Sequence, residues 1–342
     1  MAQTSQIDSN TPQTLLWAQY PDGRYGAVVQ SDGQAVYFAI QKLSNNEPAD
    51  LPSRWVWVRN LRPAPLMFAE TPHDSSRFPL VAESYCVHPK GLPNLDLERT
   101  KIVWFEQGIG AMLIEGDQVL AIIPPQANHE LPGYSAECRT ACAFAVPLDD
   151  DDLYLPLASA LPDYWSNWAA NNPLVAWHQS LTKAISRDLG QITQEFAVAS
   201  DAWPPLRVVQ VTNPNGDRSL MTSGMALRCQ PMVERELINF TDHQRLELAV
   251  GIPADVSGSR VEAMAAWLAG LARYPWHHET CFLPTQKLTT IAPYDATPTA
   301  MTGAKIEWTL TAEPQAASLE SRTVLALPNY RQQNVNVVWL TK

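Results

Sequence analysis

Apolar and polar positions alternate, or gather in short apolar runs, along most of the first 125 residues, and this pattern predicts β-strands. The turn sequences Pro21-Asp22-Gly23 and Ser31-Asp32-Gly33 separate the first three strands. Gly116-Asp117 has the composition of a tight hairpin turn between the last two. Seven strands are predicted in this part of the chain, at residues 14–20, 25–30, 35–40, 54–60, 100–105, 111–115 and 118–123.

Prolines interrupt this pattern between the fourth and fifth predicted strands. They stand at positions 63, 65, 72, 79, 89 and 93. Proline removes a backbone donor and is excluded from long helices and from central strands. We therefore expect ordered but irregular chain here, with room for one short helix.

A helical period of apolar residues opens the second half of the chain. Leu174, Trp177, Leu181 and Ile185 form one stripe at helical spacing. Asn172 is a suitable cap and Pro173 a suitable first residue, and Gly190 is expected to end the helix.

A second helix is expected from Ser259, with Glu262 completing a capping box. Pro275 is expected to end it. Its buried stripe is predicted to contain Val261, Met264, Ala265, Leu268 and Leu271.

Strands outnumber helices in the second half as well. They are predicted at 206–212, 245–251, 287–291, 305–311, 324–327 and 335–341, with a turn at 213–216. Because strands and helices do not alternate, the pattern indicates an α+β fold with mixed or antiparallel sheets and a few flanking helices. We expect two lobes, a strand-rich one at 1–160 and another at 161–342, with the acidic run 149–152 as a solvated boundary loop.

The net charge of −11 is unevenly distributed over the 342 residues. Residues 1–165 contain 10 Lys and Arg against 20 Asp and Glu, whereas the remainder contains 14 against 15. An acidic surface repels nucleic acid and anionic membrane and attracts a basic partner. The polar amino terminus does not resemble a signal peptide, and no apolar run is long enough to span a membrane. We therefore expect a cytoplasmic protein that binds neither nucleic acid nor membrane.

The five cysteines are odd in number and scattered, which argues against a disulfide framework and for free buried thiols. Cys138 and Cys142 would share one face if that segment were helical, but no second ligand pair stands near them to complete a zinc site. His277, His278 and Glu279 form the one dense cluster of ligand types, and a partly exposed loop is an alternative interpretation of it. The acidic run 149–152 lacks the spacing of a calcium loop, so it is either a solvated loop or a docking site for a basic partner.

Sequence signatures of enzymes are missing. There is no phosphate loop, no dinucleotide-binding glycine motif and no HExxH pair, and Thr222-Ser223-Gly224-Met225 lacks the first glycine of a nucleophile elbow. We therefore expect no catalytic residue, no cofactor-binding residue, no metal ligand and no cofactor.

Several segments of the second half resemble the Suppressor-of-fused (SUFU) family. They are VTNPNGDR at 211–218 with LMTSGM at 220–225, RLEL at 245–248, LAGLARYP at 268–275, LALP at 325–328 and VNVVWL at 335–340. Further segments of the first half resemble the region joined to this domain in bacterial proteins: HPKGLPN at 88–94, VWFE at 103–106, LAIIP at 120–124 and LPGY at 131–134.

The resemblance implies protein binding. The animal member restrains a transcription factor by clasping an extended segment of it, partly by strand addition, and bacterial relatives are regarded as immunity proteins that neutralise toxins. Three hypotheses follow: an immunity protein that binds a cognate toxin, an intracellular scaffold or regulator that sequesters another protein, and an enzyme with an unrecognised site. An acidic chain without catalytic motifs favours the first.

Overall fold

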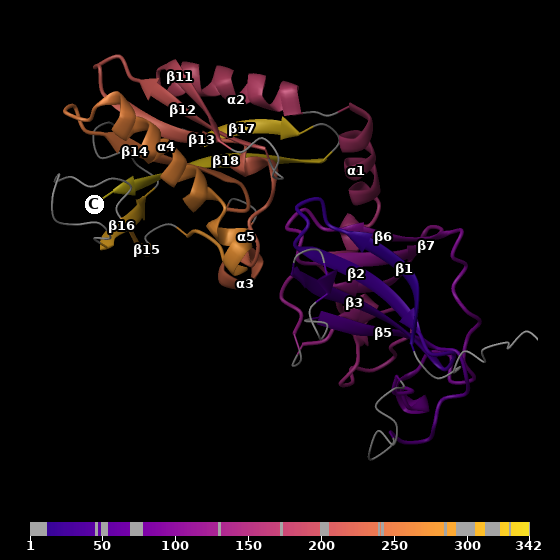
Figure 1. Ribbon diagram of the computed structural model, residues 1–342. Coiled ribbons are helices and arrows are strands. Elements are labelled where there is room, and N and C mark those ends of the chain that lie inside the picture. The colour runs from indigo at the N-terminus through magenta and orange to yellow at the C-terminus, as the bar shows by residue number, and fades with distance from the viewer. Residues whose placement is uncertain are drawn as a thin grey trace, which may run out of the picture. The chain divides into compact units, whose positions relative to one another are not determined.

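The computed structural model describes residues 12–44, 47–48, 54–68, 78–128, 131–171, 174–198, 205–238, 240, 243–283, 286–291, 305–311, 322–327 and 330–341. The chain forms two compact units, Met1–Asp163 and Tyr164–Lys342. Three sheets and a few helices make up an α+β fold, as the sequence predicted (Figure 1). No helix among these described residues is long and apolar enough to cross a membrane.

Unit 1 contains two five-stranded sheets. The first has the order β1-β2-β3-β4, with β5 on β3, and the second has the order β10-β9-β8-β7-β6. The strands are β1 (Gln13–Gln19), β2 (Tyr25–Ser31), β3 (Ala35–Ser44), β4 (Glu47–Pro48), β5 (Arg54–Asn60), β6 (Thr100–Trp104), β7 (Ala111–Glu115), β8 (Gln118–Ile123), β9 (Tyr134–Ser135) and β10 (Val146–Pro147). All pairs are antiparallel except β9 with β10.

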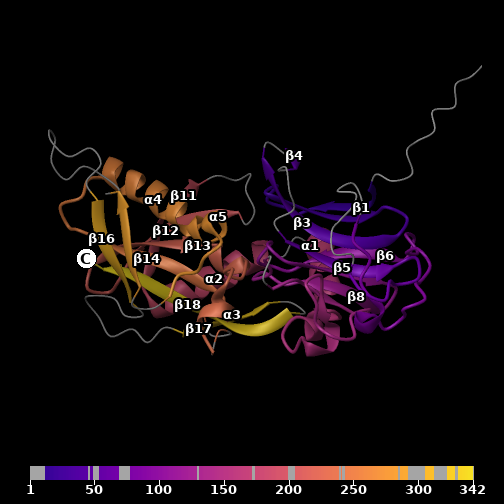
Figure 2. The same cartoon turned by 90° about the horizontal axis from the view of Figure 1, so that it is seen from below.

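The two sheets of unit 1 pack on each other, with β5 against β8 and β1 against β6 (Figure 2). β2, β5, β7 and β8 are buried along nearly their whole length, and β3 is buried from Ala35 to Ile40. The proline-rich segment connects β5 to β6, and its described parts contain one short 3-10 helix, η1 (Glu83–Tyr85). This irregular segment with one short helix agrees with the sequence interpretation.

Unit 2 is built on one mixed sheet of eight strands, ordered β11-β12-β13-β14-β18-β16-β15 with β17 on β18. β14 and β18 are parallel, and the other pairs are antiparallel. The strands are β11 (Gln191–Val198), β12 (Leu206–Thr212), β13 (Arg218–Ser223), β14 (Leu246–Ile252), β15 (Lys287–Ile291), β16 (Lys305–Thr311), β17 (Arg322–Leu327) and β18 (Tyr330–Thr341). The helices are α1 (Ala160–Asn171), which begins in unit 1, α2 (Leu174–Asp188), α3 (Val233–Glu236), α4 (Gly258–Ala272) and α5 (Tyr274–His278).

Helices α2 and α4 cover opposite faces of this sheet (Figure 1). Val208 of β12 packs with the residues of α4, whereas the next residue, Val209, packs with those of α2. Successive side chains of a strand point to opposite faces, which accounts for the division. The apolar stripes predicted for both helices are confirmed where described: Trp177 and Leu268 are buried.

Helix ends were predicted less well than helix faces. Gly190, at φ +133°, ends α2 as expected, and its N–H reaches the Ile185 carbonyl at 3.1 Å. The predicted cap at Asn172 and Pro173 lies outside the described residues. The predicted cap at Ser259 is wrong, because α4 begins one residue earlier and Ser257 holds the N-cap position, with no hydrogen bond from its side chain.

Pro275 does not terminate α4 directly. α4 ends at Ala272, and Pro275 lies in the first turn of α5, where its missing N–H has no partner to lose. His277 and His278 therefore lie in a short helix and not in a strand or loop. Helix α1 and strands β11 and β13 had no counterpart in the prediction. α1 contains a proline, and four of the eight residues of β11 are polar.

Candidate functional site

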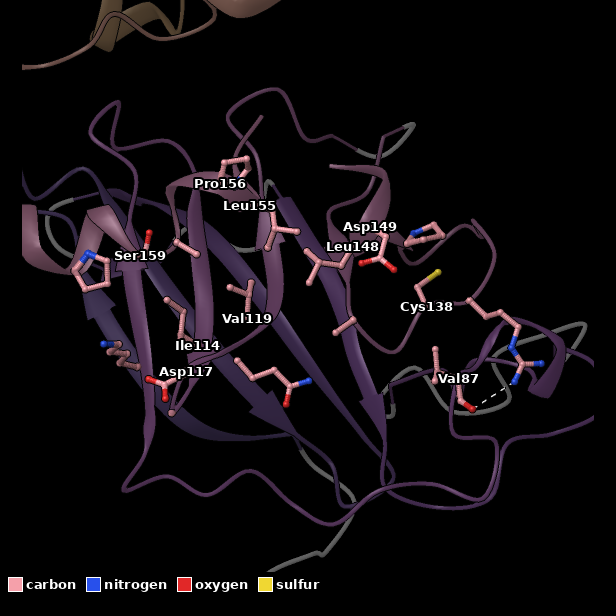
Figure 3. Close-up of a pocket in the computed structure, with 18 of the residues that line it drawn as sticks. Val87, Ile114, Asp117, Val119, Cys138, Leu148, Asp149, Leu155, Pro156 and Ser159 are labelled. Carbon is pink, nitrogen blue, oxygen red and sulfur yellow. Dashed lines mark hydrogen bonds between the residues drawn. The ribbon is translucent and has the colours of Figure 1, made fainter. Parts of the chain in front are cut away.

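The described part of unit 1 contains a pocket of about 1060 Å³ (Figure 3). It lies over one face of the sheet that contains β7 and β8 and is closed on one side by the segment between β10 and α1. This volume is of the order found for binding pockets in proteins. Its lining consists of Val87, Lys101, Ile114, Gly116, Asp117, Gln118, Val119, Ala136, Cys138, Arg139, Pro147, Leu148, Asp149, Leu155, Pro156, Ala158, Ser159, Pro162 and Asp163.

The middle of the pocket is apolar. Ile114 of β7 and Val119 of β8 point into it from the sheet, and Leu148 and Leu155 point into it from the opposite wall (Figure 3). The last two belong to the short 3-10 helices η2 (Leu148–Asp150) and η3 (Leu155–Leu157). Pro147 precedes η2 at its N-cap position, and Pro156 is the second residue of η3, where its fixed φ suits the turn.

Charged side chains surround this apolar middle. Asp117 lies in the turn between β7 and β8, and Asp149 lies on η2 at the other side of the pocket (Figure 3). Asp163 adds a third carboxylate, against Lys101 and Arg139 as the two cations of the lining. Arg139 donates a hydrogen bond to the Val87 carbonyl at 3.3 Å. The rim therefore carries one more negative than positive charge.

One aspartate of the acidic run 149–152 holds the pocket wall in place. Asp151 is buried, and its carboxylate accepts the backbone N–H groups of Leu153, Tyr154 and Leu155 at 3.0, 3.0 and 3.1 Å. Burial raises the pKa of Asp151, and the three donated hydrogen bonds oppose that shift. The interpretation of the whole run as a solvated loop is therefore wrong at Asp151, although Asp149, Asp150 and Asp152 are exposed.

The titratable side chains of the lining are three aspartates, Lys101, Arg139 and Cys138. No histidine, glutamate or tyrosine stands among the described residues that line it, and its one serine, Ser159, is paired with no base in the described contacts. No group of three or more potential metal ligands occurs anywhere in the described chain. An apolar middle inside a polar and charged rim is the arrangement found in protein–protein interfaces.

The predicted ligand cluster, His277 to Glu279, belongs to unit 2, and none of its residues lines this pocket. His277 and His278 are both exposed on α5, and the ring of His278 packs on Tyr274 with centroids 4.1 Å apart. Glu279 follows in the left-handed conformation, with φ of 51°. Among the described residues, these three are not part of a group that could hold a metal ion.

A buried serine–histidine pair lies in unit 2. His178 of α2 and Ser223 of β13 approach to 3.0 Å between Nδ1 and Oγ. Burial lowers the pKa of His178, with the Arg207 charge as a smaller cause in the same direction. Both side chains are buried and neither lines the described pocket. The contact joins α2 to the sheet, which is a structural role.

All five cysteines are free. The segment containing Cys138 and Cys142 is not helical, so the condition under which they would share one helix face is not met. The backbone of Cys138 instead pairs with that of Cys86 in an isolated antiparallel β-bridge, and the backbone of Cys142 pairs with that of Ala145 in the same way. The sequence provided no signal for the pocket, because its wall was interpreted as a solvated loop.

Comparisons of the chain with protein-family models, with curated proteins and with solved structures find no match.

Proposed function

We propose that the protein is a protein-binding module and that its partner docks over the pocket of unit 1. The observation that carries this proposal is the pocket itself, an apolar middle of Ile114, Val119, Leu148 and Leu155 inside a charged rim. Buried apolar contacts supply most of the affinity of a protein interface, and the charged rim sets its approach and specificity.

The partner is a basic protein. The 10 Lys and Arg and the 20 Asp and Glu of residues 1–165 all lie in unit 1, since residues 164 and 165 are uncharged. Nearly all of the net charge of −11 therefore belongs to the unit that contains the pocket. A surface of one sign attracts a partner of the opposite sign over distances of about a screening length, roughly 8 Å at physiological ionic strength.

Within this class, the proposal is an immunity protein that neutralises a cognate toxin by direct binding in the cytoplasm. The SUFU-like segments of unit 2 support it by resemblance, and the acidic charge of unit 1 is what a basic toxin domain requires. No enzymatic activity is needed for neutralisation, since occupying the active face of a toxin is sufficient.

The test begins with the protein encoded beside this chain in its genome. Co-purification, titration calorimetry and co-expression measure whether the two proteins bind and whether this chain restores growth. Binding with restored growth is expected. Binding without any toxicity of the partner would overturn the immunity role and favour a scaffold that sequesters its partner. No binding to that product would overturn the proposal as an immunity protein.

Two exposed apolar residues of unit 1 provide a matched pair for locating the interface. Val87 lines the pocket and is 41% exposed, whereas Leu97 is 44% exposed and is not part of the lining. Val87→Glu is expected to weaken binding at least tenfold, about 1.4 kcal/mol, by placing a charge in the apolar contact, and Leu97→Glu is expected to leave it unchanged. Equal effects of the two substitutions would place the interface elsewhere.

A further inference from the structure

The floor of the pocket in unit 1 contains one row of side chains that crosses three strands. Lys101 of β6 pairs with Ile114 of β7, and Ile114 pairs with Val119 of β8. Residues that stand opposite one another in neighbouring strands present their side chains on the same face of a sheet. All three line the pocket, so the row leads from a cation on the edge strand to two apolar residues inside the sheet.

The apolar middle of the pocket lies at the bottom of a cavity and not on a flat patch. Ile114, Val119 and Leu148 are only 4%, 9% and 8% exposed, although all three line the cavity of about 1060 Å³. Residues that are this little exposed are reached by a slender group that enters the cavity. A folded partner therefore reaches them with a side chain.

Three carboxylates of the lining have no partner among the residues that the structure describes. Asp117, Asp149 and Asp163 are exposed, and none of them has a side-chain hydrogen bond or an ion pair with another described residue. The carboxylates of Glu115 and Glu137 in the same unit, in contrast, are paired with Arg59 and His88. The carboxylates of the lining are therefore available to a ligand.

The balance of charge favours a cationic ligand. The three carboxylates face only two cations of the lining, Lys101 and Arg139, and the Arg139 guanidinium also donates to the Val87 carbonyl at 3.3 Å. Unit 1 as a whole contains 10 Lys and Arg against 20 Asp and Glu. A hollow with one dominant sign of charge concentrates ligands of the opposite sign.

Lysine and arginine are the side chains that combine an aliphatic stem with a cationic end. Their methylene groups pack on apolar surface while the charged end stays at the solvated rim. A leucine would fill the apolar middle and leave the carboxylates without a partner, and a glutamate would bring a like charge to them.

We propose that the pocket receives a lysine or arginine side chain of the partner. The aliphatic stem packs on Ile114, Val119 and Leu148, and the cationic end meets the carboxylate of Asp117 or Asp149, which lie on opposite sides of the apolar middle (Figure 3). This inference rests on the proposed function, because it names the type of residue with which the partner enters the pocket.

The first test uses the full chain and single capped amino acids, so it requires no partner. The Ile, Leu and Val methyl groups are isotopically labelled, and the methyl NMR signals are followed while Nα-acetyl-lysine methylamide or its arginine analogue is added. The norleucine analogue, which has nearly the same stem without the charge, is the matched control.

Saturable shifts are expected for the methyl signals of Ile114, Val119, Leu148 and Leu155, with the millimolar dissociation constant typical of so small a ligand. The lysine or arginine probe is expected to bind at least about threefold more tightly than the norleucine probe, which is the gain that one solvent-exposed ion pair provides. Equal binding of charged and uncharged probes, or no shift at these four residues, would overturn the proposal.

Asp149→Asn and Asp150→Asn form a matched pair on η2. Both residues are exposed, but only Asp149 lines the pocket. The preference for the charged probe is expected to disappear in Asp149→Asn or in Asp117→Asn and to persist in Asp150→Asn. A preference that survives in both lining variants, or that Asp150→Asn removes as well, would overturn the role of these carboxylates. The measurement on the natural chain stands even if a variant fails to fold.

Failure of this inference and failure of the proposed function give different results. A protein partner that binds to a chain in which the probes cause no shift would support the proposed function and overturn the inference. Probe binding by a chain that binds no protein would overturn the proposed function and leave the chemistry of the pocket as inferred. With a partner in hand, saturating lysine probe is expected to weaken its binding, and the norleucine probe at matched ionic strength is expected to do so less. Equal competition by the two probes would overturn the inference.

Discussion

The carboxylate of Glu247 and the hydroxyl of Thr222 lie 2.6 Å apart, and neither side chain is exposed to solvent. The same carboxylate accepts the backbone N–H groups of Gly224, Met225 and Ala226 at 2.9, 3.3 and 3.1 Å. One buried acid on β14 thus satisfies the turn that follows β13. Each of these four buried donors would cost free energy if it lost the carboxylate as its acceptor.

Glu247→Gln is expected to destabilise unit 2 by about 1–3 kcal/mol, because the amide group turns a donor toward one of the backbone donors. Chemical denaturation measures the loss. Glu262→Gln on the exposed face of α4 is the matched control and is expected to change stability by less than about 0.5 kcal/mol. Equal losses from the two substitutions would contradict the role assigned to the buried carboxylate.

The natural chain and Glu247→Gln should also differ in how their stability depends on pH. Burial raises the pKa of Glu247 above its ordinary 4.5, although the four hydrogen bonds lower it in part. The folded state therefore binds the proton more tightly than the unfolded state, and its stability falls as pH rises from 4.5 through the folded pKa. The stability difference between the natural chain and Glu247→Gln should narrow over that range, and a difference that widens would be inconsistent with a raised pKa.

For His178 we expect the opposite pH dependence of the stability. Burial lowers its pKa below the ordinary 6.5, so the unfolded state binds the proton more tightly, and stability is lost as pH falls from 6.5 through the folded pKa. Denaturation at several pH values should show a component that disappears in His178→Gln. His277→Gln, at an exposed position, should retain it.

Substitutions at Asp151 and at its neighbour Asp150 distinguish the structural role of a buried carboxylate from the effect of a surface charge. Asp151→Ala is expected to cost about 1–3 kcal/mol because it leaves the backbone donors of Leu153, Tyr154 and Leu155 without their acceptor. Asp150→Ala removes the same charge at an exposed position and is expected to change the stability very little.

Replacing Asp149, Asp150 and Asp152 together by Asn should slow association with a basic partner and flatten the salt dependence of the association rate without loss of stability. Stopped-flow measurements at two salt concentrations decide that point.

Gly190 and Gly258 predict opposite effects of the same substitution. Gly190 has a φ of +133°, and an added Cβ would lie 2.4 Å from the Thr212 carbonyl oxygen, so Gly190→Ala should be destabilising by more than about 1 kcal/mol. Gly258, in the first turn of α4, has open space around it, so Gly258→Ala should be stabilising by about 0.4–1 kcal/mol. Thermal unfolding compares the two variants, and a loss of stability in both would show that the open space at Gly258 is filled.

The start of α4 gives a prediction that reverses the sequence expectation. Ser259 is inside the helix, so Ser259→Ala should not cost the cap energy that a capping residue contributes. Ser257 holds the N-cap position without a side-chain hydrogen bond, and Ser257→Asp should stabilise the helix by about 0.5–1 kcal/mol through its charge and its acceptor. A measurable loss in Ser259→Ala would place the helix start back at that residue.

The sequence predicted an element correctly where its apolar residues follow one clear period. The strands at Arg54–Asn60 and Leu206–Thr212 have the predicted bounds, because turn residues and alternation specify both ends. Helix α1 was missed because Pro162 interrupts its start and its apolar residues do not form one clear stripe. β11 was missed because it lies at the edge of the sheet, where few of its side chains are buried and little hydrophobic signal is needed.

By itself the sequence determined the fold class, the buried faces of α2 and α4, and the concentration of negative charge in the first half, since each depends on residues close together in the chain. Only the tertiary structure decided that Val87, Val119 and Leu148 line one pocket and that Asp151 is a buried acceptor. These relationships depend on chain reversals between strands and on which side chains the packing removes from water. A linear pattern of residue types contains no record of either.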